Sequence, residues 1–261
     1  MSFTQIYLLG FLAIMVLMTT LWVISIFIKN VSIVDAFWGV GFAVAGLLYY
    51  LMSDGETTRS LIVLILISLW ALRLFIYLST RNWGKGEDFR YQKFRKDYGE
   101  KRYWWFSFFQ TFLLQGVLMW IVSLPLLGSM FSPDEVFSLI DILAFTIVLI
   151  GISFEAIGDY QMARFKANSS NKGKVMDKGL WKYSRHPNYF GNACLWWGFA
   201  LFSIAAGNFY TIVGPAIMTF LLLKVSGVSL LERSLKKDKP EYEEYARKTS
   251  SFIPWFPKKQ S

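Results

Sequence analysis

The chain has 261 residues, of which 54% are hydrophobic, 18% are aromatic and only 17% are charged. Soluble domains of this length carry more charge, so the composition excludes a soluble globular protein and indicates a membrane protein. The formal net charge of +9 could suggest nucleic acid binding. The basic residues lie where membrane insertion alone would place them, however, and we exclude nucleic acid as a partner.

Seven stretches of the chain are predicted as membrane spans, because a helix needs about 20 largely apolar residues to cross about 30 Å of hydrocarbon. We read the first stretch as a retained span, since it lacks a basic segment before its apolar run and is longer than the core of a signal peptide. Charges interrupt the fifth and the seventh stretch. The predicted spans are about 4–28, 34–52, 60–80, 109–130, 138–160, 187–206 and 209–228.

Basic residues gather in alternate loops between these spans. Loop 81–108, loop 161–186 and the tail from residue 229 hold most of the 27 Lys and Arg residues. Because Lys and Arg are retained on the cytoplasmic side of short loops, the N-terminus is predicted outside and the C-terminus in the cytoplasm. No repeat or flexible linker divides the chain. We therefore expect an all-α membrane protein with a single domain over residues 1–261.

The only histidine, His186, precedes Pro187 in the segment SRHPNYFG. Proline suits the first position of a helix and pushes the residue before it to extended geometry. His186 is therefore predicted to cap the sixth span. The first-turn N–H groups of that helix, with Arg185 and Lys182 beside them, predict a site for a phosphate or a carboxylate.

Polar side chains continue along the start of the same helix. Asn188 and Asn192 are one turn apart and share a face, with Tyr189 nearby. These residues are expected to extend the anion site. The alternative is an interfacial anchor, because Trp, Tyr, Arg and His commonly lie at helix ends at headgroup level.

Two carboxylates lie inside the fifth span, where an unpaired charge costs at least about 2.5 kcal/mol. Glu155 and Asp159 are four residues apart and share one face. Arg73 and Lys224 lie inside other spans. The free-energy cost of placing these charges inside the membrane is lowest if they face an internal cavity filled by water or a ligand. A purely structural network of ion pairs is the alternative.

Four segments of the chain carry a resemblance to a known family. They are NVSIVDAFWG, RNWGKGEDFRYQKFRKDYG, SRHPNYFG and LLERSLKKDKPEYEEYARKTSSFIPWFP. Over roughly residues 30–257 the chain resembles the bacterial branch of the steroid 5-alpha-reductase-like family of integral membrane proteins. The Arg-His-Pro-Asn-Tyr segment is also similar to one in sterol reductases and in isoprenylcysteine carboxyl methyltransferases.

The resemblance implies a seven-helix enzyme of the bacterial inner membrane that holds NADPH in a cavity open to the cytoplasm. Hydride would pass to a carbon–carbon double bond conjugated to a ketone, in a steroid-like or other lipophilic substrate. The chain has no Gly-x-Gly-x-x-Gly, so the dinucleotide must be held without a Rossmann fold. The cofactor-binding part is expected at about 150–257, and no metal site is predicted. The cofactor-facing residues, from the resemblance and from the helix start together, are Glu155, Asp159, Lys166, Lys174, Arg185, His186, Asn188, Tyr189, Asn192, Lys224 and Glu232.

The resemblance also implies a catalytic role for Asp35, which matches an acidic residue that orients the ketone in steroid reductases. The family's second carbonyl-binding residue, a tyrosine, falls on Trp70, which lacks a hydroxyl. Hydride addition builds negative charge on the carbonyl oxygen, so a preorganised donor must meet that oxygen. A carboxylate can serve only if it is protonated or orients a donor. The alternative role for Asp35 is a helix N-cap near Lys29 and Asn30.

Two other functions stay open. A methyltransferase using S-adenosylmethionine would reuse the Arg-His-Pro-x-Tyr helix start and Glu232, but would need no place for a 2′-phosphate. A non-enzymatic membrane binding protein would need neither cofactor. The expected partners are membrane lipid and a lipophilic small molecule, and the sequence indicates no oligomeric state.

Overall fold

Helices make up the regular structure of the chain. The computed structural model describes residues 1–53, 57–131, 136–225, 228, 232 and 241–258. Within these ranges there is no strand, and one isolated bridge joins Ser184 to Ser250. The helices form two compact units, Met1–Ser138 with Phe202–Thr211 and Leu139–Leu201 with Ile212–Ser261. A single functional domain over the whole chain stays a prediction.

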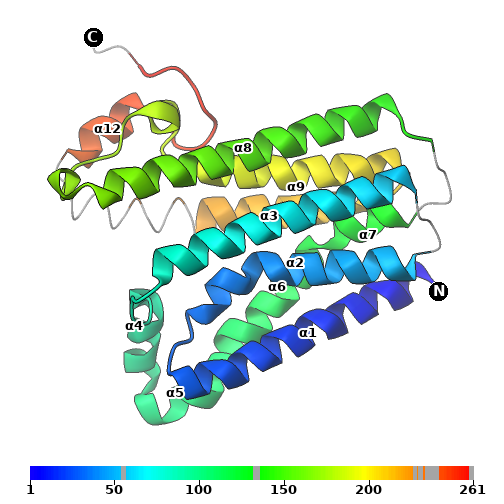
Figure 1. Cartoon of the computed structure of the whole chain (residues 1–261), viewed down its shortest axis with the longest axis horizontal. Helices are drawn as coiled ribbons and strands as arrows, with labels where there is room; N and C mark the ends of the chain where they lie inside the picture. Colours follow the sequence, from blue (N-terminus) through cyan, green and yellow to red (C-terminus); the bar gives the residue numbers. More distant parts are fainter. Residues whose placement is uncertain (54–56, 132–135, 226–227, 229–231, 233–240, 259–261) are drawn as a thin grey trace. The chain divides into compact units, whose positions relative to one another are not determined.

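The first unit begins with three long helices, α1 (Phe3–Ile28), α2 (Ile33–Met52) and α3 (Thr58–Asn82). α2 lies beside both α1 and α3 (Figure 1). A capping box starts α1, with Ser2 as N-cap and Gln5 three residues later, and another starts α3, with Thr57 and Ser60. Each box satisfies backbone donors that a helix start leaves without a partner.

The predicted fourth span is longer and less regular than the sequence suggested. After α4 (Phe89–Tyr98), the chain turns at Gly99, whose φ of 86° is in the left-handed region that favours glycine. It continues through α5 (Glu100–Ser107), a π-helical stretch (Phe108–Leu113), α6 (Leu114–Val122) and α7 (Leu124–Met130). The continuous helical stretch suited to crossing a membrane thus runs over Glu100–Met130 and contains the predicted span 109–130.

The core of the first unit is aromatic and tightly packed. Trp70, Phe42 and Tyr49 are fully buried, and the Tyr49 hydroxyl lies 2.9 Å from the Ser123 hydroxyl. Gly10 on α1 makes room for this tyrosine, since a Cβ at that position would lie 2.3 Å from the ring. Trp70 is therefore a core residue, with its ring centroid 6.0 Å from that of Phe42.

The second unit is built on α8 (Leu139–Ala167) and α9 (Pro187–Ala205), whose last residues, from Phe202, belong to the first unit. Short 3-10 turns cover Ser169–Asn171 and Gly179–Lys182 between them. After a 3-10 turn at Phe209–Ile212, α10 (Val213–Phe220) and a π-helical stretch (Leu221–Val225) follow, and α12 (Tyr242–Lys248) precedes the C-terminal segment.

Five helices in the described part of the chain are long and apolar enough to cross a membrane. They are Phe3–Ile28, Ile33–Met52, Thr58–Asn82, Glu100–Met130 and Leu139–Ala167, and Phe209–Val225 is a shorter apolar helix. α1, α3 and α8 keep many large apolar side chains exposed, as lipid-facing helices do. The described residues confirm an all-helical fold with five helices that could span a membrane, whereas the count of seven spans and their orientation stay predictions.

Candidate functional site

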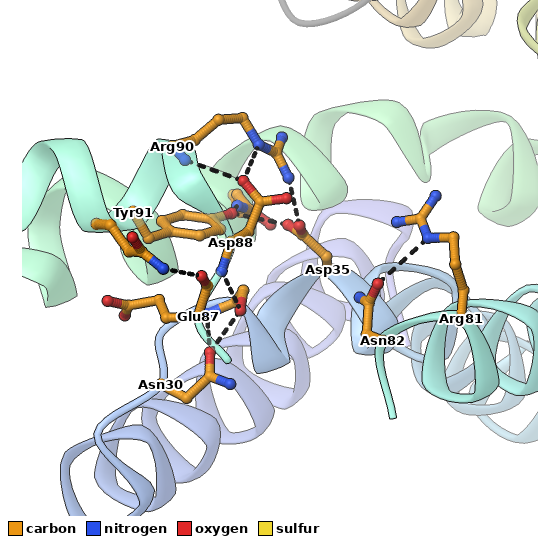
Figure 2. A network of polar contacts seen from close by, with 11 residues as sticks. Asn30, Asp35, Arg81, Asn82, Glu87, Asp88, Arg90 and Tyr91 are labelled. Atoms are coloured by element: carbon orange, nitrogen blue, oxygen red, sulfur yellow. Dashed lines mark hydrogen bonds and ion pairs between the residues drawn. The ribbon is translucent and has the colours of Figure 1, made fainter. Parts of the chain in front are cut away.

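In the first unit, polar side chains gather around Asp35, in the first turn of α2 (Figure 2). Its carboxylate accepts a hydrogen bond of 2.6 Å from Arg90 Nη2 and one of 2.7 Å from the Tyr91 hydroxyl. The N-cap position of α2 belongs to Ser32, whose side chain makes no capping bond. The alternative of Asp35 as an N-cap is therefore wrong, because its carboxylate is turned to two donors on α4.

The loop before α4 holds these donors in place. Asp88 caps α4 by accepting from the Arg90 backbone at 3.0 Å and from Arg90 Nε at 2.9 Å. Its own backbone N–H donates to the Ser32 hydroxyl at 3.2 Å. The neighbouring Glu87 accepts from the backbone N–H of Val31 at 2.9 Å. Two consecutive acidic residues thus attach the α4 loop to the turn between α1 and α2.

A second ion pair, between Arg95 and Glu87, lies next to the pair of Arg90 with Asp35. Arg95 donates to Glu87 through Nη2 at 2.8 Å and Nε at 3.0 Å, in the two-pronged geometry that arginine forms with carboxylates. The Glu87 side chain is only 8% exposed, so this pair is well shielded from water. The guanidinium of Arg95 also lies over the ring of Tyr103, 5.0 Å from its centroid.

The electrostatics of this network favour one protonation pattern. Burial, followed by the adjacent Asp35 carboxylate, raises the pKa of Tyr91 well above its ordinary value, so the hydroxyl stays protonated at neutral pH. Burial works against the charged form of Arg90, but its bonds to Asp88 and the charge of Asp35 raise its pKa. Burial likewise opposes ionisation of Asp88, and its bonds from Arg90 outweigh that and lower its pKa. The network therefore presents a neutral hydroxyl beside a permanent positive charge.

In the second unit, the two residues that precede α9, Arg185 and His186, contact Glu232, which follows α9 in the sequence. Glu232 Oε1 lies 2.7 Å from Arg185 Nη2, 2.8 Å from Arg185 Nε and 3.3 Å from His186 Nε2. Arg185 Nη1 donates to the carbonyls of Ala246 at 2.5 Å and Thr249 at 3.0 Å. The three guanidinium nitrogens thus all face protein acceptors, and Arg185 ties the start of α9 to α12.

His186 is buried and lies at the helix start that Pro187 defines, as predicted. Its carbonyl accepts from the backbone N–H of Phe190 at 3.0 Å, the first bond of α9. Its ring stacks on Tyr189 with centroids 5.4 Å apart. Burial lowers the pKa of His186 to about 4, even though the charge of Glu232 acts in the opposite direction. At neutral pH the ring is uncharged, and a proton on Nε2 would point toward Glu232.

The carboxylates of α8 meet the asparagines of α9 in two successive pairs. Asn188 Nδ2 donates to Asp159 Oδ1 at 3.1 Å, and Asn192 Nδ2 donates to Glu155 Oε2 at 3.3 Å. Both predicted faces are confirmed, since each helix presents its two polar residues to the other. Asn188 Oδ1 accepts from the backbone N–H of Tyr189 at 3.1 Å. One of the first-turn N–H groups of α9 that were predicted to bind an anion therefore donates to a side chain of the same helix.

Close packing of the α8 and α9 backbones brings these side chains within hydrogen-bonding distance. A Cβ on Gly151 of α8 would lie 2.6 Å from the Gly191 carbonyl of α9, and a Cβ on Gly191 would lie 2.5 Å from the Gly151 carbonyl. Such distances do not occur for real Cβ atoms, so both positions need glycine. Small residues at a helix contact let two backbones approach closely within a membrane.

Three of the other predicted cofactor residues lie at the surface. Lys166 at the end of α8, Lys174 in the following loop and Lys224 in the π-helical stretch are all exposed. Tyr189 is half-buried against His186. The structure thus brings Arg185, His186 and Glu232 together, and it pairs Asp159 with Asn188 and Glu155 with Asn192. A role for any of these residues in binding a cofactor stays a prediction.

The sequence did not single out the partners of Asp35. Glu87, Asp88, Arg90 and Tyr91 stand in the segment GEDFRYQ, which contributed to the family resemblance and to the basic loop count only. The available signal was a pair of acidic residues next to an Arg-Tyr pair, in a loop otherwise rich in lysine and arginine. Nothing in that spacing indicates Asp35 as the partner, because 55 residues separate it from Arg90.

Comparison with known proteins gives a family without an assigned activity. An uncharacterized protein of the fission yeast Schizosaccharomyces pombe is 26% identical to the chain over 278 residues, which cover 96% of this chain and 80% of that protein. No solved structure matches the chain with comparable significance. A family profile matches residues 21–249, and the chain therefore belongs to the family described as "Protein of unknown function (DUF1295)".

Proposed function

We propose that the chain is a membrane-embedded, NADPH-dependent reductase of the steroid 5-alpha-reductase-like type. It would reduce a carbon–carbon double bond conjugated to a ketone in a lipophilic substrate. The observation that carries this proposal is the contact of Asp35 with Tyr91 and Arg90. This contact sets a protonated hydroxyl and a positive charge side by side at the start of a helix suited to spanning a membrane.

Reduction of an enone places specific demands on these residues. As hydride adds to the β carbon, the electrons of the double bond move toward the carbonyl oxygen, and the α carbon later takes a proton from water. A preorganised donor that meets the developing negative charge lowers the barrier. The Tyr91 hydroxyl, which donates to Asp35 in this structure, would turn its one proton to the carbonyl oxygen when substrate binds, and Asp35 would keep Arg90 as its partner. Tyr91 would then supply the hydroxyl that Trp70 lacks.

In this proposal, residues of the second unit would bind the nicotinamide cofactor, which when bound supplies the hydride. Asn192 donates to Glu155, while its Oδ1 is buried and accepts from no described residue. A buried acceptor without a donor costs about 1–3 kcal/mol, which a ligand N–H or O–H would recover. His186 is neutral and can bond a ribose hydroxyl, and the exposed Lys166 and Lys174 can meet phosphates. Because Arg185 is engaged with protein acceptors, we assign it a positioning role.

We further propose seven membrane spans in a bacterial inner membrane, with the N-terminus outside and the C-terminus in the cytoplasm. α9 and the Phe209–Val225 segment would be the sixth and seventh spans. The support is the gathering of basic residues in loop 81–108, loop 161–186 and the tail. This arrangement would leave the Asp35 network and the Arg185 cluster on the cytoplasmic side, where NADPH is available.

A titration of the full chain in detergent tests the proposal. Calorimetry should show heat of binding for NADPH, and the Asn192→Leu variant should bind it more weakly by roughly five- to tenfold, because one buried hydrogen bond is worth about 1–1.5 kcal/mol. Binding of S-adenosylmethionine in place of NADPH would identify a methyltransferase. Binding of neither would identify a membrane protein without this enzymatic role.

A further inference from the structure

Large apolar side chains are exposed in the C-terminal segment, residues 250–258, which follows α12. Ile253, Trp255 and Phe256 are 64%, 71% and 75% exposed, so no described part of the chain covers them. The rings of Trp255 and Phe256 are neighbours, with centroids 6.5 Å apart. Single apolar residues are common on protein surfaces, but a group of them marks a contact with a membrane or with a partner.

Hydrogen bonds hold the backbone of the C-terminal segment against the residues that precede α9. The Ser184 hydroxyl donates to the carbonyl of Phe252 at 2.8 Å, and the backbone N–H of Trp255 donates to the carbonyl of Tyr183 at 2.9 Å. Pro254 lies between these two contacts and fixes its own φ. The apolar side chains are therefore presented by a backbone that is tied down, not by a loose chain end.

The segment lies at the level where the apolar part of α8 ends. From Leu139 to Gly158, α8 rises by about 29 Å at 1.5 Å per residue, which is close to the thickness of about 30 Å of the hydrocarbon core. Beyond Gly158 the sequence of α8 becomes polar, DYQMARFKA. The turn that holds the segment is fixed at this level, because Trp181 Nε1 donates to the Gly158 carbonyl at 3.0 Å. A bilayer that covers the apolar part of α8 therefore ends beside the C-terminal segment.

The exposed apolar face of α8 continues onto this segment. An apolar groove along α8 has Phe154 and Ile157 in its lining, together with Leu180 from the turn before α9. The ring of Phe154 lies 5.3 Å from that of Phe190, in the first turn of α9, and Phe190 lies 6.1 Å from Phe252. All three rings are partly exposed. One apolar surface thus runs from the lipid-facing side of α8 to the C-terminal segment.

We propose that the C-terminal segment binds the membrane surface, with Ile253, Trp255 and Phe256 inserted at the boundary between acyl chains and headgroups. Tryptophan is enriched at this boundary, and the insertion removes exposed apolar surface from water. Lys258 is exposed at the end of the segment and can extend its ammonium group to the headgroups. A membrane fits better than a protein partner, because the patch is continuous with the exposed face of α8 and lies where the apolar part of α8 ends. This site does not depend on the proposed reductase activity.

Fluorescence quenching measures the depth of the segment. Ile253→Cys and Phe256→Cys would be introduced one at a time into the full chain, in which Cys194→Ser removes the only natural thiol. Each variant would be labelled with a small thiol-reactive fluorophore and placed in phosphatidylcholine nanodiscs, whose two faces are both open to water. A nitroxide on the acyl chain near the headgroup should quench both labels, whereas iodide in the water should leave their emission nearly unchanged.

A label on α12 provides the matched control. Glu243→Cys, at an exposed position of that helix, should show the reverse pattern, with strong quenching by iodide and little by the nitroxide lipid. If iodide quenched the labels at 253 and 256 as strongly as the label at 243, the segment would lie in water and the proposal would be wrong. Protection from both quenchers would indicate a contact with protein, a second copy included, and would also overturn it. Gel filtration of each labelled variant, compared with the wild type, checks that it is folded.

Discussion

Single residues in this chain take their chemical character from neighbours that are distant in the sequence. Asp35 is paired with Arg90 and Tyr91, and His186 is buried against Glu232 and Tyr189. The ion pair and the hydroxyl fix the position of the Asp35 carboxylate, whereas burial keeps the His186 imidazole neutral. These two environments lead to two predictions.

Replacing Tyr91 with phenylalanine removes the hydroxyl that Asp35 orients. We expect the rate of double-bond reduction to fall by at least about 100-fold, the usual cost of removing one donor to a developing oxyanion, while the dissociation constant for NADPH stays the same. Turnover with an enone substrate and calorimetric binding measure the two effects. The matched control is Tyr98→Phe, an exposed tyrosine on the same helix. Normal turnover by Tyr91→Phe would show that the network is structural only.

The stability of the protein should depend on pH through His186. The pKa is about 4 in the folded chain and 6.5 in the unfolded one, so the unfolded state binds more protons between these values. The contribution to the free energy of unfolding is fully present above pH 6.5 and is lost as the pH falls toward 4. It reaches about 3 kcal/mol at most.

Thermal unfolding of the wild type and of His186→Gln, compared from pH 7.5 to pH 4, measures this contribution. Glutamine cannot be protonated, so the variant should lose less stability over the same range. Parallel curves for the two proteins would contradict a buried, neutral histidine.

At the scale of elements, the contact between α8 and α9 combines small residues with polar pairs. Gly151 and Gly191 let the backbones approach, and the pairs Asp159 with Asn188 and Glu155 with Asn192 then lie within hydrogen-bonding distance. An amide group that donates to a buried carboxylate reduces the cost of placing that charge in an apolar environment. The contact with α9 thus allows α8 to hold two acidic side chains, although α8 is otherwise apolar enough to cross a membrane.

Removing one of these carboxylates separates structure from ligand binding. Asp159→Leu should abolish NADPH binding while the protein still inserts and folds, because the proposed cofactor contacts lie at the same end of α9. Calorimetry in detergent and the yield of membrane-extracted protein measure the two properties. Asp177→Leu, at an exposed position of the same unit, is the matched control. Unchanged cofactor affinity in Asp159→Leu would assign the pair to helix packing alone.

At the scale of the whole molecule, the open question is how many helices cross the membrane. Five helices of the described chain are long and apolar enough, whereas seven spans are predicted from the sequence. An odd number of spans places the termini on opposite sides, so the positions of the two ends exclude six spans. A reporter inserted at 207–208, which is external only if α9 and Phe209–Val225 both cross, separates seven spans from five.

Reporter fusions to each terminus measure this property. A reporter after Ser261 should be active in the cytoplasm and one before Met1 should be active outside, because the basic loops are retained in the cytoplasm. A fusion within loop 81–108 should report the same side as Ser261. Both termini on one side would remove one span from the proposed arrangement.

Much of the fold could be predicted from the sequence, because membrane spans depend on local composition. Helix existence follows from long apolar runs, and the start of α9 follows from Pro187, whose fixed φ and missing N–H act locally. The shared faces of Glu155 with Asp159 and of Asn188 with Asn192 follow from helical periodicity alone. The resemblance to a known family led to Asp35, although not to its partners.

Only the tertiary structure decided what these residues contact. The pairing of Asp35 with Arg90 spans 55 residues, and that of Arg185 with Glu232 spans 47, so no local pattern encodes either. The structure also showed that Arg185 faces protein acceptors and that Trp70 is a core residue. Apolar periodicity determines whether a segment is a helix, but the partner of a polar side chain depends on how distant helices pack, and that is a property of the folded chain.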